Sequence, residues 1–347
     1  MAILAQDSFA AYPDIATTSQ GLQSEWMILG GANQGSMVPG RFGGQAVKNV
    51  GSLNTPFSFG KALYVPGAGN ATQTIRFALN YTTTAHQAGD IMQTRNNGNG
   101  GTVVIAAGFN TSDQLYIAVS GSTVYTYPTP ISQGSWRSVG IAWTGGVAGW
   151  IDLYIDGVKA GGGAHTFSGN TSTLTADFIQ FNNLTANAGF VQAITIGDYI
   201  HTDSATWLGE RWIEPLVPSS NASVAWTPLS GANWTQVKEL PCDGDTTYNS
   251  TVTAGATDTF GIVSLSTTPL TIENVRVKVA VRKTDATTHN LHAVMKSGAA
   301  ALSEGPDFAV AGTYLYAHYD LPTDPNTAVA WTPSGVNGSQ PGYKLVT

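Results

Sequence analysis

Residues 135–163 read SWRSVGIAWTGGVAGWIDLYIDGVKAGGG, and this stretch carries a clear pattern of alternating side chains. From Val139 to Trp143 bulky apolar residues alternate with glycine and alanine, and from Trp150 to Ile155 aliphatic residues alternate with aromatic and acidic ones. A two-residue period rich in β-branched and aromatic side chains is typical of a β-strand. Asp156-Gly157 supplies the residue pair that a type I′ turn favours, because both of its central residues take a positive φ. The stretch therefore predicts strand, glycine loop, strand, tight turn and strand.

The second of these strands carries the candidate ligand contacts. Trp150 and Tyr154 lie on the face opposite the aliphatic side chains, so they point away from the predicted core. Exposed tryptophan and tyrosine offer flat apolar surfaces against which a sugar ring can stack. We therefore select Trp150 and Tyr154 as candidate ligand-binding residues. Packing of Trp150 beneath a loop is the simpler alternative, and we favour it.

The hairpin also carries a family resemblance. A tryptophan strand followed by an aliphatic-Tyr-aliphatic-Asp-Gly turn resembles the laminin-G-like and concanavalin-A-like jelly rolls. The segments GRFGGQAVKNVG (residues 40–51) and AITIGDYI (residues 193–200) are similar to an early strand and a closing strand of those domains. The resemblance covers roughly residues 1–203 and implies a jelly roll. It implies less about activity, because this scaffold hosts lectins, glycanases and interaction modules.

The composition extends this prediction to the whole chain. The 347 residues include 40 glycines, and short apolar runs are separated by Ser, Thr, Asn and Gly without a sustained helical period. We expect an all-β protein of two β-sandwich domains, the first a concanavalin-A-like (laminin-G-like) jelly roll. The predicted boundaries are 1–203 for the first domain, 204–223 for a linker that contains two prolines, and 224–347 for the second domain.

The low charge excludes some partners and favours others. Charged residues make up 11% of the chain, against about 25% in typical soluble domains. The formal net charge is −7, and the 15 lysine and arginine residues form no basic run, so we expect no binding to nucleic acid. Apolar runs are too short for membrane insertion. An uncharged surface and exposed sheet edges favour a homo-oligomer and contacts with other proteins.

The second half of the chain carries its own resemblance. Residues 226–262 (WTPLSGANWTQVKELPCDGDTTYNSTVTAGATDTFGI) and 275–298 are similar to a segment of tailed-bacteriophage structural proteins, as is the opening MAILAQDSF. The resemblance covers about the last 140 residues and implies a virion protein: a head decoration, an appendage or a tail-associated component. The opening lacks the features of a signal peptide, and Cys242 is the only cysteine. Both points favour folding in a reducing cytosol.

The sequence offers no evident catalytic group. The glutamates do not form the Glu-x-Asp-x-x-Glu cluster of retaining glycanases on this scaffold, which would supply a nucleophile and a general acid. Glu210 and Glu214 come nearest, and Arg211 between them is an expected ion-pair partner. No Gly-x-Ser-x-Gly elbow is present. A carboxylate beside the Cys242 thiol raises its pKa, which disfavours a catalytic thiolate. We therefore expect that the chain is not an enzyme.

Four aspartates are the candidate metal ligands. Asp152 and Asp156 flank the hairpin, whereas Asp243 and Asp245 lie in the polar loop CDGDTTY. Calcium prefers several carboxylate and carbonyl oxygens, and laminin-G-like domains often hold calcium at the rim of the sandwich. The favoured alternative is that these aspartates accept hydrogen bonds from their own turns. We expect no cofactor other than this candidate Ca²⁺.

These observations lead to one main prediction and one alternative. The main prediction is a non-enzymatic structural component of a bacteriophage virion, made in the host bacterial cytoplasm and acting through contacts with other virion proteins. The alternative is a carbohydrate- or receptor-binding module on a phage fibre, with a host surface glycan as its partner. Trp150 is the residue that best separates the two.

Overall fold

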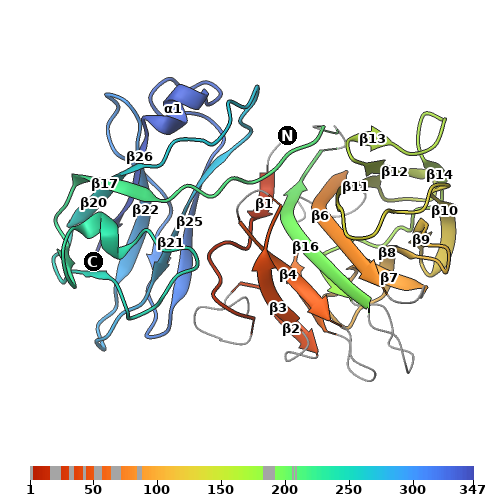
Figure 1. Ribbon diagram of the computed structural model, residues 1–347, viewed down its shortest axis with the longest axis horizontal. Helices are drawn as coiled ribbons and strands as arrows, with labels where there is room; N and C mark the ends of the chain where they lie inside the picture. Colours follow the sequence, from red (N-terminus) through yellow and green to blue (C-terminus); the bar gives the residue numbers. More distant parts are fainter. Residues whose placement is uncertain are drawn as a thin grey trace. The chain divides into compact units, whose positions relative to one another are not determined.

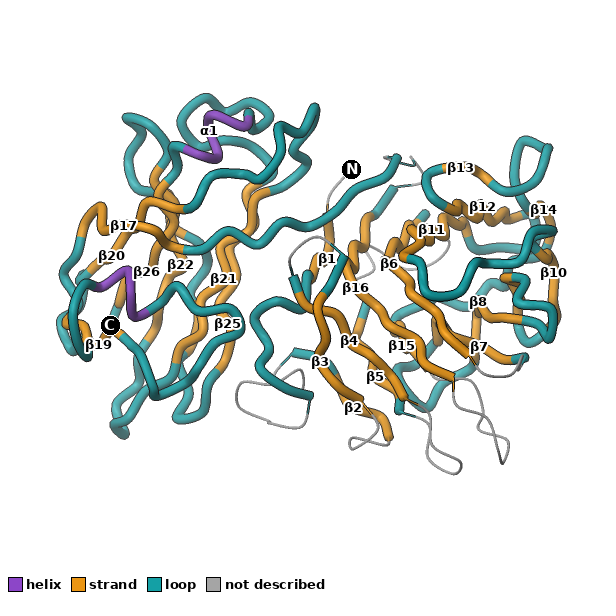
Figure 2. Tube along the Cα trace, viewed as in Figure 1, coloured by secondary structure: helices purple, strands orange, loops and turns teal. Residues whose placement is uncertain are grey.

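The computed structural model describes residues 3–15, 25–30, 35–41, 44–50, 57–63, 72–83, 88–182, 192–204, 207 and 209–347. The chain divides into two compact units. The first unit contains Met1–Ala10 and Trp26–Ile213, and the second contains Ala11–Glu25 and Glu214–Thr347. Among the described residues, helix is confined to the 3₁₀ turn η3 (Asn233–Gln236) and the short helix α1 (Pro333–Asn337), drawn in purple in Figure 2.

The first unit contains two antiparallel sheets. The first sheet has the strand order β13-β12-β11-β6-β16-β4-β3, with β1 also paired to β16 and β14 to β12 (Figure 1). Its strands are β1 (Ile3–Asp7), β3 (Gly35–Pro39), β4 (Gln45–Val50), β6 (Gln73–Thr83), β11 (Trp136–Thr144), β12 (Gly149–Ile155), β13 (Val158–Lys159), β14 (Phe167–Gly169) and β16 (Gln192–Thr202). The quoted stretch forms β11, β12 and β13, as predicted.

The second sheet has the order β10-β9-β8-β7-β15-β5-β2. Its strands are β2 (Met27–Gly30), β5 (Ser58–Ala62), β7 (Gly89–Arg95), β8 (Val103–Phe109), β9 (Leu115–Val119), β10 (Ser122–Thr126) and β15 (Phe178–Asn182). In both sheets strands distant in sequence are neighbours, for example β6 beside β16 and β7 beside β15. This connectivity is typical of a jelly roll.

The core of the first unit lies between the inner faces of its two sheets. Phe77 of β6 and Ile141 of β11 are fully buried, and Trp143 of β11 is 2% exposed. Phe77 packs edge-on against Phe181 of β15, with ring centroids 5.1 Å apart. Along β6 and β11, the residues that alternate with these buried side chains point to the opposite side of the first sheet. We call this side the outer face of the first sheet.

The tight turn after β12 has the backbone that its sequence demands. Asp156 has φ = 50° and Gly157 has φ = 83°. Both angles lie in the left-handed region, as a type I′ turn requires. Tyr154 and Ile155 of β12 consequently pair with Lys159 and Val158 of β13.

The second unit is a smaller assembly of sheets. One sheet has the order β17-β20-β26-β22-β23, with β24 paired to β22, and β21 pairs with β25. These strands are β17 (Pro218–Ser223), β20 (Thr257–Ile262), β21 (Val275–Val281), β22 (Asn290–Lys296), β23 (Ser303–Glu304), β24 (Phe308–Ala309), β25 (Leu315–Leu321) and β26 (Gln340–Leu345). A two-stranded ribbon of β18 (Thr227–Pro228) and β19 (Asn249–Ser250) completes the unit.

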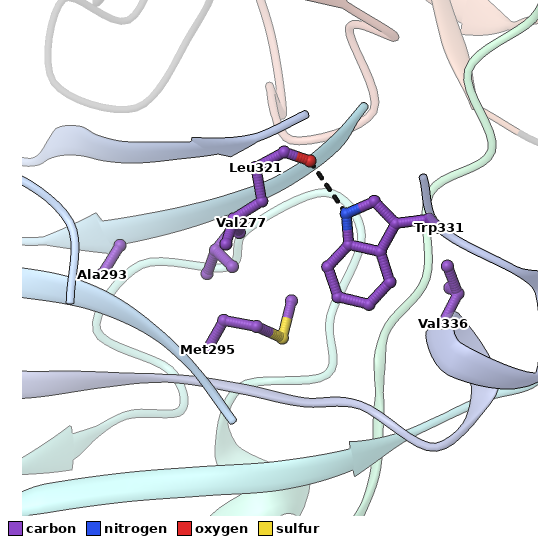
Figure 3. Packing of buried hydrophobic residues seen from close by; sticks show 6 residues of the cluster. All are labelled: Val277, Ala293, Met295, Leu321, Trp331 and Val336. Atoms are coloured by element: carbon purple, nitrogen blue, oxygen red, sulfur yellow. Dashed lines mark hydrogen bonds between the residues drawn. The ribbon is translucent and has the colours of Figure 1, made fainter. Parts of the chain in front are cut away.

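Apolar side chains from both sheets of the second unit meet in one cluster (Figure 3). Val277 of β21 and Leu321 of β25 lie on one side, and Met295 of β22 lies on the other. Trp331 closes the cluster, and its indole Nε1 donates a hydrogen bond of 2.9 Å to the carbonyl of Leu321. This buried layer between two sheets confirms the prediction of an all-β protein with two sandwiches, the first of which is a jelly roll.

The unit boundaries depend on contacts that the sequence did not reveal. Within the second unit Tyr12 packs edge-on against Tyr316, with ring centroids 5.5 Å apart, and Glu25 pairs with Lys278 at 3.3 Å. These contacts explain why Ala11–Glu25 belongs to that unit. Of the expected linker 204–223, the part up to Ile213 belongs to the first unit, and Pro218–Ser223 is strand β17. No described helix has the length and hydropathy that a membrane crossing requires.

Candidate functional site

The candidate site lies on the outer face of the first sheet, where strand β12 exposes its polar and aromatic residues. Trp150, Asp152 and Tyr154 occupy alternate positions, while Ile151 and Leu153 between them are fully buried. Trp150 and Tyr154 are half-buried, whereas Asp152 is 6% exposed. The sequence prediction of their side of the strand is therefore confirmed, and each aromatic ring also has a partner.

His165 is the partner of Trp150. The two rings stack with centroids 4.4 Å apart and an interplanar angle of 10°. Asp152 holds this arrangement, because its Oδ2 lies 3.1 Å from His165 Nδ1 and its Oδ1 accepts a 2.9 Å hydrogen bond from the backbone N–H of Thr166. The side chain of His165 is 33% exposed. Trp150, Asp152 and His165 thus form a fixed aromatic platform with one side open to solvent.

Trp207 is the partner of Tyr154. Their rings are nearly parallel, with centroids 4.2 Å apart and an interplanar angle of 6°. Gly140 of β11 makes room for the indole, because a Cβ atom at this position would lie 2.0 Å from Trp207 Cζ3. Only glycine at position 140 therefore permits Trp207 to lie flat on this part of the outer face. Burial raises the pKa of Tyr154, and the nearby Asp152 carboxylate adds to the shift.

Arg76 lies beside this ring pair. It is directly opposite Gly140 in the pairing of β6 with β11, and it is 4% exposed. Its Nε donates a 2.9 Å hydrogen bond to Ser138 Oγ, but Nη1 and Nη2 donate none to the described residues. Burial lowers the pKa of the guanidinium to about 10, and the nearby Asp198 carboxylate opposes this shift. A buried cation with two unused donor groups is uncommon and calls for an explanation.

Asp198 on β16 is a second unusual group on this face. It occupies a β-bulge between Gly197 and Ile200 and has φ = 47°. The residue is 5% exposed, and its Oδ2 accepts no hydrogen bond from the described part of the chain. Burial raises the pKa of Asp198 to about 6, against the opposing effect of Arg76. Bulges and left-handed backbone at non-glycine residues are frequent beside functional sites.

Trp207 and Gly209–Ile213 form a covering segment over these groups. Glu210 forms an ion pair with Arg41, and the backbone N–H of Ile213 donates to Asp198, which favours the charged carboxylate. Arg211 Nη1 donates a 3.1 Å hydrogen bond to the carbonyl of Glu210. The covering segment therefore shields Arg76 and Asp198 from solvent.

This arrangement permits three kinds of chemistry. The platform at Trp150 offers a flat apolar ring surface, which suits a sugar ring. Arg76 offers a donor fork that suits a planar anion. Asp198 has a pKa near neutrality, which suits a group that gives or takes a proton.

The two candidate metal ligands of the first unit are engaged in hydrogen bonds. Asp152 holds His165 and Thr166, as described above. Asp156 accepts a 2.7 Å hydrogen bond from Arg137 Nη1 and one of 2.8 Å from the backbone N–H of Ser138. These contacts fix the hairpin turn and its strand.

The two candidate ligands of the second unit do not converge either. Asp243 accepts hydrogen bonds from Thr247, at 3.3 Å from the backbone N–H and 2.9 Å from Oγ1. Asp245 accepts two hydrogen bonds from Arg282, at 2.9 and 2.7 Å, and one of 2.8 Å from Tyr314. No group of three or more His, Cys, Asp or Glu side chains in the described residues is placed to hold a metal ion. The Ca²⁺ site stays a prediction from the sequence.

The sequence analysis did not predict four residues of the outer face: His165, Trp207, Arg76 and Asp198. Arg76 left a signal, since it is a charge at an outward position of the alternating strand QTIRFALN. Trp207 left a weaker signal in the apparent linker. Nothing in the sequence indicates the pairing of His165 with Trp150, because the two residues lie on different segments, fifteen positions apart along the chain (165 − 150).

Comparisons with known proteins give structural matches alone. No family model matches the chain, and no curated protein matches it. An alginate lyase in complex with alginate tetrasaccharide matches with a TM-score of 0.38 and 10% identity, over 50% of this chain and 85% of that protein. A glucuronan lyase from Trichoderma reesei matches with a TM-score of 0.38 and 14% identity, over 51% of this chain and 90% of that one.

A third match is a carbohydrate esterase from the Shiga toxin-encoding bacteriophage phi24B. Its TM-score is 0.39 and its identity 17%, and the match covers 58% of this chain and 100% of that protein. At such low TM-scores and identities, no neighbour's activity is carried over to this chain. These matches to polysaccharide lyases and a carbohydrate esterase nevertheless overturn the main sequence prediction. A non-enzymatic structural component of a virion, and the statement that the chain is not an enzyme, are therefore both corrected.

Proposed function

We propose that the first unit binds carbohydrate through the outer face of its first sheet. The platform of Trp150 and His165 is the observation that carries the proposal. The two rings are parallel, the Asp152 carboxylate fixes them, and the side chain of His165 is 33% exposed. A rigid aromatic surface of this kind contributes contact area without a large loss of side-chain entropy on binding.

The exposed loop beside the platform adds polar contacts for a sugar. The hydroxyl groups of a sugar both donate and accept hydrogen bonds, so exposed backbone groups beside an aromatic ring can fix their orientation. The loop after β13 exposes backbone groups close by, where Lys159 Nζ already binds the carbonyls of Gly163 and Ala164. The platform therefore combines ring contact with hydrogen bonding.

The proposal places this module on a bacteriophage particle. The support is the resemblance of residues 226–262 and 275–298 to tailed-phage structural proteins. In this proposal the second unit attaches the chain to the particle, and a host surface glycan is the ligand of the first unit. Mass spectrometry of purified phage particles tests this location independently of glycan binding. Absence of the chain from the particles would contradict the location.

Substitution of Trp150 tests the binding function. We expect Trp150→Ala to weaken binding of the full chain to its glycan about tenfold, because the ring contact is lost. The screen uses an array of bacterial surface polysaccharides, followed by calorimetry on the strongest binder. Trp234→Ala is the matched control, since Trp234 lies on η3 of the second unit, and it leaves the affinity unchanged. Equal affinity of wild type and Trp150→Ala contradicts the proposal.

Carbohydrate processing at the same face is the second candidate function. The observation that favours it is Asp198, whose pKa is raised by burial to about 6 and whose Oδ2 accepts no hydrogen bond from the described residues. A carboxylic acid with such a pKa can protonate the oxygen of a glycosidic bond as that bond breaks. Glu210, whose charge acts on Arg76 together with that of Asp198, is the second carboxyl group that such a reaction needs.

Release of new reducing ends from the bound polysaccharide tests this second candidate. Wild type releases them, and Asp198→Asn loses at least about a hundredfold in rate, because general acid catalysis contributes about that much. Retained binding in Asp198→Asn distinguishes lost chemistry from lost affinity. Binding without any release of reducing ends in the wild type rejects processing and leaves the binding function in place.

A further inference from the structure

Trp207 fills a place on the outer face that suits another flat ring. Its indole lies parallel to Tyr154, with centroids 4.2 Å apart, above a position where only glycine leaves room. Indole Nε1 is buried and donates no hydrogen bond to the described residues. The contact therefore rests on ring stacking and lacks the polar complement that a buried tryptophan usually finds.

Arg76 adjoins this place with its donors unused. It is the cross-strand partner of Gly140, so its side chain starts from the position next to the indole. It is 4% exposed, and both Nη1 and Nη2 lack an acceptor among the described residues. Leaving such donors unsatisfied costs free energy, which a structural role alone does not explain.

The two amine groups of Arg76 match one chemical partner well. A guanidinium presents parallel N–H groups in a fixed fork, which fits the two oxygens of a carboxylate. Asp198, 5% exposed, adds an Oδ2 atom that accepts no hydrogen bond from the described residues. Two donors and one acceptor at this place match a carboxylate and a neighbouring hydroxyl.

We infer that Tyr154, Gly140 and Arg76 form a subsite for an acidic sugar unit, whose place Trp207 holds in the free chain. The sugar ring takes the position of the indole on Tyr154, and its carboxylate accepts hydrogen bonds from Nη1 and Nη2 of Arg76. A hydroxyl group of the sugar donates to Asp198 Oδ2. This inference rests on the proposed binding function and names its ligand class.

Charged groups of both signs surround this subsite. In the part of the chain described, Arg41, Arg211, Asp198 and Glu210 act on Arg76, and Asp152 acts on Tyr154. Three cations thus lie near three carboxylates, so selection of an anion depends on the unused donor fork of Arg76 and not on a surplus of positive charge. The contacts that hold the covering segment include the ion pair of Arg41 with Glu210, the ring stack and the hydrogen bond from the Ile213 N–H. A ligand can replace such contacts at modest cost, because a partly exposed ion pair stabilises little.

Matched acidic and neutral sugars test the ligand class. The probes are oligoglucuronate and oligogalacturonate, each compared with the neutral cello- or galacto-oligosaccharide of the same length, in calorimetry with the full chain. We expect the acidic member of a pair to bind about tenfold more tightly or better, because hydrogen bonds to a charged group are strong. Added salt should weaken the acidic member selectively.

Three variants test whether Arg76 and Trp207 determine the preference for acidic over neutral sugars. Arg76→Lys keeps the charge but loses the fork, so the preference for the acidic probe should fall about tenfold. Trp207→Ala opens the place on Tyr154 and should tighten binding of the acidic probe about threefold to tenfold, the value of one aromatic stack. Arg282→Lys is the matched control in the second unit, where Arg282 pairs with Asp245, and it should leave binding unchanged.

The outcomes separate this inference from the proposed function. Tighter binding of acidic probes that Arg76→Lys abolishes and Trp207→Ala increases supports the inference. Equal binding of acidic and neutral members by the wild type overturns the inference and leaves carbohydrate binding in place, as does an acid preference that Arg76→Lys does not change. Since Trp207→Ala does not touch Arg76, a loss of acidic binding in that variant also overturns the inference. A wild type that binds no oligosaccharide or polysaccharide contradicts the proposed function itself.

Discussion

Two buried aspartates, Asp258 in the second unit and Asp198 in the first, have opposite surroundings. Asp258 is fully buried, and its Oδ1 accepts hydrogen bonds of 2.6 and 2.9 Å from the backbone N–H groups of Ala225 and Trp226. Its Oδ2 accepts another of 2.9 Å from Asn233 Nδ2. Asp198 is nearly as buried, but one of its oxygens accepts no hydrogen bond from the described residues.

The difference separates a carboxylate whose hydrogen bonds build the fold from one that keeps an oxygen without a hydrogen bond from the described residues. Asp258 of β20 accepts hydrogen bonds from the start of the Trp-Thr-Pro turn. These bonds satisfy the buried carboxylate and hold the turn against the strand. Asp198 sits on a left-handed bulge, and its neighbour Arg76 also keeps unused donors. Buried groups that lack partners and have shifted pKa values concentrate at functional sites.

Removal of the Asp258 carboxylate should have the largest effect. Asp258→Ala leaves the N–H groups of Ala225 and Trp226 and the Asn233 amide buried without an acceptor, and each costs about 1–3 kcal/mol. We expect the free energy of unfolding of the second unit to fall by about 4 kcal/mol. Urea unfolding followed by fluorescence measures it. A loss below about 1 kcal/mol would show that the network does not hold the turn.

Removal of the Asp198 charge should act in the opposite direction and with pH. The raised pKa, about 6 against an ordinary 3.8, means that folding favours the protonated carboxyl. The stability of the wild-type first unit therefore falls as pH rises from about 4 to 6, and the cost persists above that window. Asp198→Asn lacks this cost, so its free energy of unfolding relative to wild type should rise by about 3 kcal/mol between pH 4 and pH 7.

A buried histidine makes this difference measurement necessary. Burial lowers the pKa of His201 to about 4, so the stability of the first unit falls as pH falls from 6.5 toward 4, where the unfolded chain binds a proton that the folded chain does not. This effect opposes that of Asp198 in the wild type, but it is common to both proteins and cancels in the difference. A variant curve parallel to that of the wild type from pH 4 to pH 7 would show that Asp198 is solvated.

Substitution of Gly140, which lies beneath the Trp207 indole, should have an intermediate effect on stability. Gly140→Ala puts a Cβ atom 2.0 Å from the indole, so Trp207 must leave Tyr154. We expect a loss of about 1–3 kcal/mol in the free energy of unfolding of the first unit and a change in tryptophan fluorescence. In a Trp207→Ala background the same substitution should cost much less. An equal cost in both backgrounds contradicts the contact.

The smallest effect concerns an exposed cluster of the second unit. Burial lowers the pKa of His292, but hydrogen bonds to Asp307 and Glu304 outweigh it and raise the pKa above 6.5. The protonated ring therefore stabilises the unit below pH 6.5, and this contribution disappears as pH rises through the raised pKa. His292→Gln should remove a pH dependence below about 1 kcal/mol in thermal unfolding. An unchanged pH dependence would place the titration elsewhere.

The same contrast explains what the sequence can predict. The alternation in residues 136–155 and the Asp156-Gly157 turn are local signals, so they predicted β11, β12 and the side of the strand on which Trp150 lies. The motif around Trp226 is also local, and in the structure it forms the hydrogen-bond network of Asp258. A strong sequence pattern here marks a part of the fold.

The candidate site depends on contacts between distant segments. Trp207 reaches Gly140 and Tyr154 only because the apparent linker folds back onto the first sheet, and nothing local to Trp207 indicates this. The bulge at Asp198 is equally hidden, since IGDYI reads as a regular strand. The sequence therefore pointed to Trp150 and Tyr154 but could not supply their partners.

Hydrogen exchange with and without a bound glycan tests whether carbohydrate binds at β12. A saturating polysaccharide ligand should slow exchange in β12 and in the loop around His165, with both units otherwise unchanged except at the covering segment. Slower exchange confined to the second unit, with β12 unaffected, would contradict a carbohydrate site on the outer face of the first sheet.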